Sequence, residues 1–127
     1  MAHYPHQIRL RGPWRGKGVE TEGPVSGEVD LLLSQIQGPV ILERNFGFPG
    51  RIDEEEQIWL TITNLPGLAK IRLNDHLLGE NQTGSMEWEV KKRLKVRNHL
   101  SIEIHTRETG QGLVMVAIEI RRMIVPS

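Results

Sequence analysis

The stretch GLAKIRLNDHLLGE, residues 67 to 80, predicts a β-hairpin. Apolar residues alternate with other residues before its tip, at Ala69, Ile71 and Leu73. Such alternation places one face of a strand on a core and leaves the other face in water. Asn74 and Asp75, at the tip, are residue types that enter left-handed backbone conformations more readily than most. We expect a strand, a tight turn and a return strand that ends near Gly79.

The same period of two recurs elsewhere in the chain, and no segment of comparable length keeps a helical period. The further alternating segments are residues 8–10, 58–62, 86–90 and 100–104. Turn-forming residues separate them: Gly12-Pro13, Gly23-Pro24, Gly38-Pro39, Pro49-Gly50, Pro66-Gly67 and Gly110-Gln111-Gly112. Many short antiparallel strands need such punctuation. The predicted fold class is therefore all-β, an antiparallel sandwich or barrel.

Three segments do not keep the period of two throughout. The last apolar run, residues 113–125, is apolar on both faces at its start, which is typical of a central strand covered on both sides. Residues 28–36, EVDLLLSQI, fit either a strand or a short helix, because periodicity does not separate the two at this length. Residues 13–27 are rich in glycine and charge and predict a long surface loop or an extended edge.

Composition excludes several classes of function. The 127 residues predict a single domain, residues 1–127, that buries a core without a metal or a disulfide. The chain has no cysteine, and its 16 basic and 16 acidic residues balance, so we expect no nucleic-acid or anionic-membrane partner. No apolar run approaches the ~20 residues of a membrane span, and the first residues lack a secretory-signal pattern. We expect a cytoplasmic domain.

The order of strands and turns resembles a known family. Residues 42–49, LERNFGFP, are similar to a strand that carries paired basic or polar residues, a phenylalanine and a proline. Residues 55–80 are similar to a strand, a short link and a strand that ends in a hairpin, and residues 86–104 to a strand, a basic turn, Asn-x-Leu and a strand. With IRLRGPW at residues 8–14, they resemble the N-terminal jelly-roll domain of family 2 glycoside hydrolases, the β-galactosidase and β-glucuronidase group.

The resemblance implies a jelly-roll β-sandwich with the galactose-binding-domain-like fold. The family's hairpin carries Asn-Gly where this chain has Asn74-Asp75. Its catalytic carboxylates lie on a separate TIM barrel, for which this chain has no residues, so we expect a stand-alone, non-catalytic module rather than an enzyme. Such a module would bind carbohydrate on the loops at one end of the sandwich or on the concave face of one sheet. The alternative is a structural domain that self-associates, as a homo-oligomer, or binds another protein without binding sugar.

Two tryptophans and a histidine are the candidate ligand-binding residues. Trp59 lies between Ile58 and Leu60, off the inward parity, so it lies on the outer face or is covered by another element. Trp14 follows Gly-Pro at the end of the first strand. An exposed ring at either position would indicate a partner surface, although packing is the more frequent use of tryptophan. His76, beside the hairpin tip, is expected to be exposed.

The acidic run at Asp53, Glu54, Glu55 and Glu56 is the candidate metal site. The resemblance implies that a structural calcium could be held in such a sandwich, and carboxylate oxygens suit that ion. Calcium needs about six to eight converging oxygens, whereas consecutive side chains beside a strand point to alternate faces. A solvated loop is therefore the favoured alternative, and no other cofactor is expected.

The remaining reactive residues form no recognised motif. The five histidines lack metal-ligand spacing, although His3-x-x-His6 could bind adventitious metal, and no serine lies in a G-x-S-x-G elbow. The basic stretch KKRLKVR, residues 91–97, lacks the interleaved aromatic residues of a nucleic-acid binder. In the resembled domain this stretch is an exposed turn between strands, which we also expect here.

Overall fold

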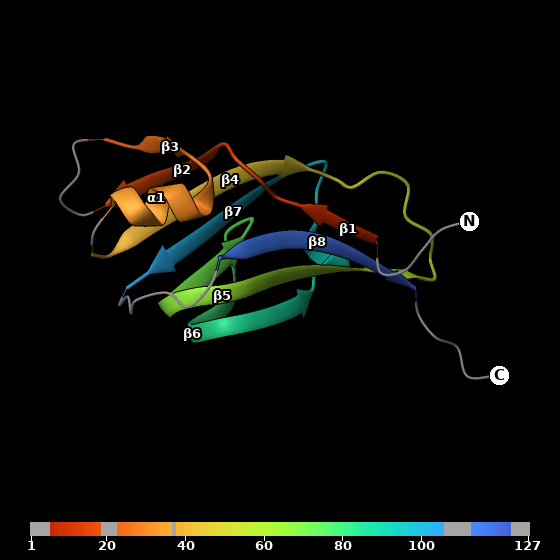
Figure 1. Cartoon of the computed structure of the whole chain (residues 1–127). Helices are drawn as coiled ribbons and strands as arrows, with labels where there is room; N and C mark the ends of the chain where they lie inside the picture. The colour runs from red at the N-terminus through yellow and green to blue at the C-terminus, as the bar shows by residue number, and fades with distance from the viewer. Residues whose placement is uncertain (1–5, 19–22, 37, 106–112, 123–127) are drawn as a thin grey trace.

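The computed structural model describes residues 6–18, 23–36, 38–105 and 113–122, and the side chains of all of these except residues 81 and 82. Antiparallel strands dominate this part of the chain, as Figure 1 shows. The strands are β1 (His6–Arg9), β2 (Trp14–Gly18), β3 (Val25–Gly27), β4 (Val40–Gly47), β5 (Glu56–Leu73), β6 (His76–Glu89), β7 (Arg97–Ile104) and β8 (Met115–Arg122). The described residues also form two short helices, α1 (Val29–Gln35) and the 3-10 helix η1 (Lys91–Arg93).

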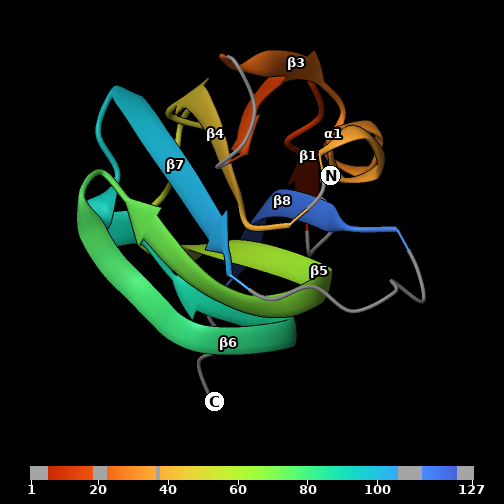
Figure 2. The ribbon, with the colours of Figure 1, turned by 90° about the vertical axis from the view of Figure 1, so that its left-hand side faces the viewer.

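The described strands form one hydrogen-bonded sheet that curls into two layers. The order along it is β1-β8-β5-β7-β4-β2-β3, and β6 pairs with β5 off this path. β5 belongs to both layers, because residues 56–63 pair with β8 and residues 69–73 pair with β7. Figure 2 shows β5 and β6 curving together. The predicted all-β antiparallel sandwich is therefore confirmed.

The bend in β5 lies near a position where the sequence predicts a turn. Pro66-Gly67 is expected to separate two strands, but β5 runs through it as one strand of 18 residues. Asn64 adopts a φ of 62°, and the pairing with β6 is irregular around it. The Nδ2 of Asn64 donates to Leu113 O at 3.2 Å, which fixes the bend against the segment before β8. A bulge therefore bends the strand without ending it, and the turn prediction is wrong.

The hairpin predicted at residues 67–80 is confirmed at its tip. Leu73 pairs with His76, and Asn74 and Asp75 have φ values of 50° and 67°. Both angles lie in the left-handed region that a type I′ hairpin turn requires. The alternating apolar residues before the turn are fully buried: Ala69, Ile71 and Leu73. The predicted end near Gly79 is wrong, because β6 continues along the curve of β5.

The helix α1 packs against the core that the two layers enclose. Residues 28–36, which fit a strand or a helix by sequence, contain this helix. Val29 and Leu32 are buried, and so is Ile36 directly after the helix. A methyl group placed on Gly16 of β2 would lie 2.9 Å from Ile36 Cδ1 and 3.2 Å from Leu32 Cδ1. Glycine at this position therefore allows the close approach of helix and strand.

The other predicted segments lie at the two ends of the strand order. Residues 14–18 and 25–27 form β2 and β3, which pair at one edge of the sheet, so the extended-edge alternative is correct for these residues. Residues 19–22 of the predicted segment lie outside the described residues. β8 lies between β1 and β5, so the last apolar run is a central strand as predicted. The predicted cover on both faces at its start is wrong, because Leu113 is 75% exposed. Ala117, on the face of β8 away from the core, is buried within this chain. In the part of the chain that the structure describes, neither helix is long and apolar enough to cross a membrane.

Candidate functional site

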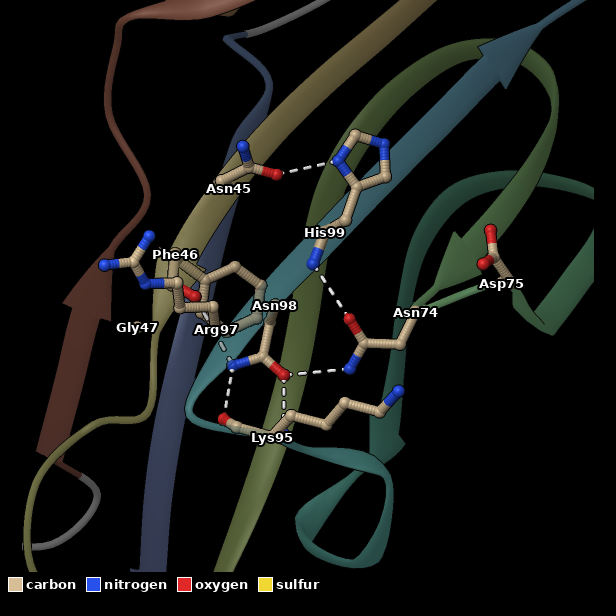
Figure 3. A pocket seen from close by; sticks show the side chains of 9 residues that line it. All are labelled: Asn45, Phe46, Gly47, Asn74, Asp75, Lys95, Arg97, Asn98 and His99. Carbon is tan, nitrogen blue, oxygen red and sulfur yellow. Dashed lines mark hydrogen bonds between the residues drawn. The ribbon is translucent and has the colours of Figure 1, made fainter.

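Nine residues line an open cleft of about 620 Å³, which we call the loop-end cleft. They come from the end of β4, the turn between β5 and β6, the loop before β7 and the start of β7 (Figure 3). The lining residues are Asn45, Phe46, Gly47, Asn74, Asp75, Lys95, Arg97, Asn98 and His99. A volume of this order suits a small ligand, because such sites commonly measure about 300–1,000 Å³.

Strand parity brings four of these residues to the outer face of the sheet. Asn45 pairs with His99, and Gly47 pairs with Arg97, across β4 and β7. Directly opposed residues share a face, and Leu100, of the other parity, is fully buried in the core. Glycine at position 47 leaves the space above β4 open, because a methyl group there would meet only one backbone oxygen, at 3.8 Å.

Asn98 is the polar centre beneath the cleft and is only 2% exposed. Its Oδ1 accepts hydrogen bonds from Lys95 N and from Asn74 Nδ2, both at 2.8 Å. Its Nδ2 donates to Lys95 O at 2.9 Å and to Phe46 O at 3.4 Å. All four hydrogen-bonding positions of the amide are thus satisfied, and Figure 3 shows Asn98 at the centre of this network. Asn98 thereby joins β4, the β5–β6 turn and the loop before β7.

Asn74 extends this network from the hairpin tip to β7. Its backbone N donates to His99 O at 2.9 Å, and its Oδ1 accepts from His99 N at 2.9 Å. Its Nδ2 also donates to Arg93 O at 3.0 Å. The left-handed turn residue is therefore fixed through both its backbone and its side chain. A ligand would meet walls that are already ordered, which lowers the entropy cost of binding.

The ring of His99 stands on the outer face between two polar neighbours. Its Nδ1 lies 2.7 Å from Asn45 Oδ1, and its Nε2 lies 3.6 Å from Glu43 Oε1. In the neutral ring, a proton on Nδ1 would donate to Asn45. In the protonated ring, Nε2–H would also face the Glu43 carboxylate. The ring is therefore oriented at both nitrogens while it remains exposed to solvent.

Three charged side chains around the cleft remain available to a ligand. Asp75, Lys95 and Arg97 are all exposed, and within the described residues their side chains make no hydrogen bond or ion pair. The cleft therefore offers one carboxylate and two cations beside the amide of Asn45. Lys95 and Arg97 belong to the basic stretch at residues 91–97, whose prediction as an exposed turn between strands is confirmed.

The structure places Trp14 in the core. Its side chain is fully buried, and its Nε1 donates to Leu10 O at 2.7 Å. No face of the ring is open to a ligand. Trp14 is therefore a packing residue, which corrects its prediction as a ligand-binding one.

Trp59 lies half-buried on the outer face of β5, at the part that pairs with β8. The guanidinium of Arg121 lies over its ring, 4.5 Å from the centroid, and its Nε1 donates to Gln57 Oε1 at 3.1 Å. Of the two predicted positions for Trp59, the outer face is thus correct, and Arg121 covers part of the ring. His76 is exposed, as expected, beside Asp75 at the hairpin tip. The three predicted ligand-binding residues do not meet in one site.

The acidic run does not form a metal site. The Oε1 of Glu56 accepts from the backbone N of Asp53 at 3.0 Å, and Glu55 pairs with an arginine of β8. Lys91 Nζ donates to the backbone oxygens of Asp53 and Glu56, each at 2.8 Å. Where the structure describes the chain, no group of three His, Cys, Asp or Glu side chains could hold a metal ion. The carboxylates at residues 53–56 do not converge, which corrects their prediction as a calcium site.

An ion-pair cluster lies beside Trp59. Arg121 donates to Glu87 through Nη2 at 2.6 Å and Nη1 at 3.2 Å, and through Nε to Glu119 at 2.9 Å. The hydrogen bonds from Arg121 lower the pKa of Glu87. The hydrogen bond to Glu87 is the main cause that raises the pKa of Arg121, and the hydrogen bond to Glu119 raises it further. This cluster joins β6 to β8 across β5.

The lowered pKa of Glu87 makes a pH-dependent contribution to stability. A carboxylate whose folded-state pKa lies below its unfolded value of about 4.3 stabilises the fold above that value and loses its effect as the pH falls through the folded-state pKa. We expect Glu87→Gln to lower the free energy of unfolding by at most about 1 kcal/mol at pH 7, because the pair is exposed and screened. Urea denaturation should find a smaller difference from wild type at pH 3. The exposed Glu54→Gln is the control, and an equal loss at both pH values would contradict the argument.

No protein-family model matches the chain, and no curated protein matches it by sequence. Solved structures do match it. A β-D-glucuronidase of Dictyoglomus thermophilum has a TM-score of 0.71 at 15% identity, over 96% of this chain and 29% of its own. A β-glucuronidase of an uncultured Clostridium species has a TM-score of 0.72 at 15% identity, over 96% and 30%.

The resemblance to family 2 glycoside hydrolases is confirmed at the level of the fold. A β-D-mannosidase of Dictyoglomus thermophilum also matches, with a TM-score of 0.64 at 18% identity over 79% of this chain and 16% of its own. This chain therefore spans less than a third of the length of these enzymes. At these identities the comparisons establish a shared fold, and activity is a separate question.

Sequence reasoning did not identify most residues of the loop-end cleft. Asn98 lies in the Asn-x-Leu motif, and Arg97 in the basic stretch, but neither pattern indicates a cleft. Asn45 and His99 both have outward strand parity, which is a signal for a shared polar surface. This signal becomes informative only when the pairing of β4 with β7 is known.

Proposed function

We propose that this chain is a non-catalytic β-sandwich module that binds carbohydrate in the loop-end cleft. The observation that carries the proposal is the convergence of charges of both signs and an amide around one ordered cleft. Asp75 accepts hydrogen bonds, Lys95 and Arg97 donate them, and the amide of Asn45 can do both. A sugar has hydroxyl groups that both donate and accept, so it matches such a mixed lining better than a simple anion does.

The half-buried ring of Phe46 supports the same proposal. Phe46 lines the cleft and packs against the core, and its strand parity is opposite to that of Asn45 and Gly47, so it bounds the cleft on the core side at a fixed position. Binding sites for small molecules commonly combine apolar walls with a few polar groups that set the orientation of the ligand. The matched enzymes are glycosidases by their names, which agrees with a carbohydrate ligand.

The absence of a second carboxylate supports a non-catalytic role. Glycoside hydrolysis commonly needs two carboxyl groups, roughly 5–9.5 Å apart on either side of the scissile bond. Asp75 is the single carboxylate among the residues that line the loop-end cleft. The cleft can therefore hold a sugar without providing the acid and base that hydrolysis requires.

The proposal is tested by titrating labelled protein with galacturonic acid, glucuronic acid, galactose and glucose at millimolar concentration, beside a glycan array. We expect the backbone amide signals of Asp75, Arg97 and His99 to shift with at least one sugar. Gly47→Leu should weaken that binding at least tenfold, because the new side chain fills the cleft while the strand tolerates it. No binding to the array and no shift at these residues would refute the function.

A matched variant separates a filled cleft from a general effect of an added leucine. Arg72 also points outward, from β5, and lines no part of the loop-end cleft. Arg72→Leu should leave the affinity unchanged. An equal loss of affinity in both variants would mean that the ligand does not bind in the cleft.

A further inference from the structure

A second cleft, of about 400 Å³, adjoins the loop-end cleft on the outer face of the sheet. We call it the sheet cleft, and its lining residues are Pro13, Arg15, Ser26, Glu43, Arg44, Asn45 and His99. Asn45 and His99 line both clefts. The hydrogen bond between their side chains, at 2.7 Å, therefore marks the boundary, and a ligand that passes over it enters both spaces.

The two clefts together cross most of one layer. Arg15 of β2 pairs with Ser26 of β3 on one side and with Glu43 of β4 on the other, so these three side chains share the outer face. The strand order continues through β7 to β5, where the loop-end cleft reaches the turn after β5. Four strand spacings of about 4.8 Å give a length of roughly 19 Å. That length exceeds a single sugar ring.

Each cleft contains an exposed arginine and a carboxylate. Arg97 and Asp75 lie in the loop-end cleft, and Arg15 and Glu43 lie in the sheet cleft. On β4, Arg97 pairs with Gly47 and Arg15 pairs with Glu43, so the two partners are four residues apart. About 13 Å along the strand and about 10 Å across two strand spacings place the two arginine backbones roughly 16 Å apart.

We propose that the ligand is an acidic oligosaccharide that lies across both clefts, with one sugar carboxylate at Arg97 and another at Arg15. The inference rests on the carbohydrate-binding function proposed above. The planar guanidinium donates two parallel hydrogen bonds to the two oxygens of a carboxylate. A hydroxyl group has one oxygen and does not match this pair of donors. The sugar hydroxyls between the two acidic units donate to Glu43, which lies on β4 between the two arginines, and hydroxyls beyond the unit at Arg97 donate to Asp75 after β5.

A stretch of acidic protein fits the same surface less well. Glu43 and Asp75 would repel its carboxylates, and it would bring few hydroxyl donors to satisfy them. Neutral sugars carry no carboxylate, so they would not accept both of the parallel hydrogen bonds that each guanidinium can donate. The alternation of cation and carboxylate along the two clefts thus favours a chain that carries both acids and hydroxyl groups.

The test compares galacturonic acid with its linear tetramer by calorimetry on the intact chain. We expect the tetramer to bind at least tenfold more tightly than the monomer. Arg15→Ser should remove most of this gain, whereas Arg97→Ser should weaken the binding of both ligands. Each variant removes an exposed side chain, so the circular dichroism spectrum should match that of wild type.

Lys17→Ser is the matched control, because Lys17 is also exposed on β2, two residues from Arg15, and lines neither cleft. The loss of the Lys17 side chain should not alter the affinity for the tetramer.

Equal affinities for monomer and tetramer, or equal losses of tetramer affinity in Lys17→Ser and Arg15→Ser, would overturn the extended site while leaving the proposed function intact. No binding of either ligand, together with a blank glycan array, would overturn both. A tetraglutamate peptide that binds as tightly as the tetramer would indicate a protein partner and overturn the choice of ligand.

Discussion

Replacing Trp14 with alanine is expected to lower the free energy of unfolding by about 3–5 kcal/mol, the range for a fully buried tryptophan. The variant removes a side chain with no exposed surface and leaves Leu10 O without the indole donor. Since small domains are stable by about 5–15 kcal/mol in total, Trp14→Ala could unfold at room temperature. Urea denaturation followed by circular dichroism measures the loss.

Trp14→Phe keeps the result measurable. It retains most of the packing but not the N–H, so we expect a smaller loss of about 1–3 kcal/mol. Trp59→Ala is the matched control, since Trp59 is half-buried on the outer face and should cost about 1 kcal/mol. Equal losses for Trp14→Ala and Trp59→Ala would contradict the assignment of Trp14 to the core. So would a Trp14→Ala protein of normal stability that has lost ligand binding.

Asn98→Ala should cost about 2–4 kcal/mol, because a buried polar group that loses its partner costs about 1–3 kcal/mol and this amide has several partners. The backbone N and O of Lys95, the O of Phe46 and the Nδ2 of Asn74 would each lose a hydrogen bond. We expect a lower urea midpoint with an unchanged slope. Amide hydrogen exchange should also become faster at Lys95.

Two further variants separate the amide's hydrogen bonds from its volume. Asn98→Asp keeps the two acceptor positions but turns a carboxylate toward Lys95 O and Phe46 O, so it should be unstable at pH 7. Part of the loss should be recovered in acid, where a protonated carboxyl can donate to one of these oxygens. Asn45→Ala, at an exposed position with one hydrogen bond, should cost less than about 1 kcal/mol. A loss in Asn98→Ala no larger than that of Asn45→Ala would refute the role of the network.

The sequence predicted the strands because the period of two is a local signal. Ala69, Ile71 and Leu73 alternate in the chain and are all buried, and Asn74-Asp75 has the turn chemistry that its φ values require. The failure at Pro66-Gly67 has a physical reason. Punctuation by proline and glycine normally ends a strand, but here the left-handed Asn64 and pairing on both sides allow β5 to bend and continue.

The loop-end cleft could not be predicted in the same way. Its residues come from positions 45–47, 74–75 and 95–99, which meet only through the pairing of β7 with both β4 and β5. The role of Asn98 depends on four hydrogen bonds to three residues, Phe46, Asn74 and Lys95, that are spread over these segments. Residue type alone pointed instead to tryptophans, and Trp14 shows why that signal is weak: the same indole that can stack on a sugar is also well suited to a core.

The bend in β5 has a consequence for how the chain folds. β5 meets β6 across a two-residue turn, whereas β7 and β8, its other partners, come later in the chain. Contacts between sequence neighbours close small loops and form early. Strands that are distant in the sequence lose more conformational entropy when they pair, because a longer loop must close. The hairpin can therefore act as a nucleus on which each layer assembles in turn. A slip of one residue in this hairpin would reverse the faces of β5 and be transmitted to both layers.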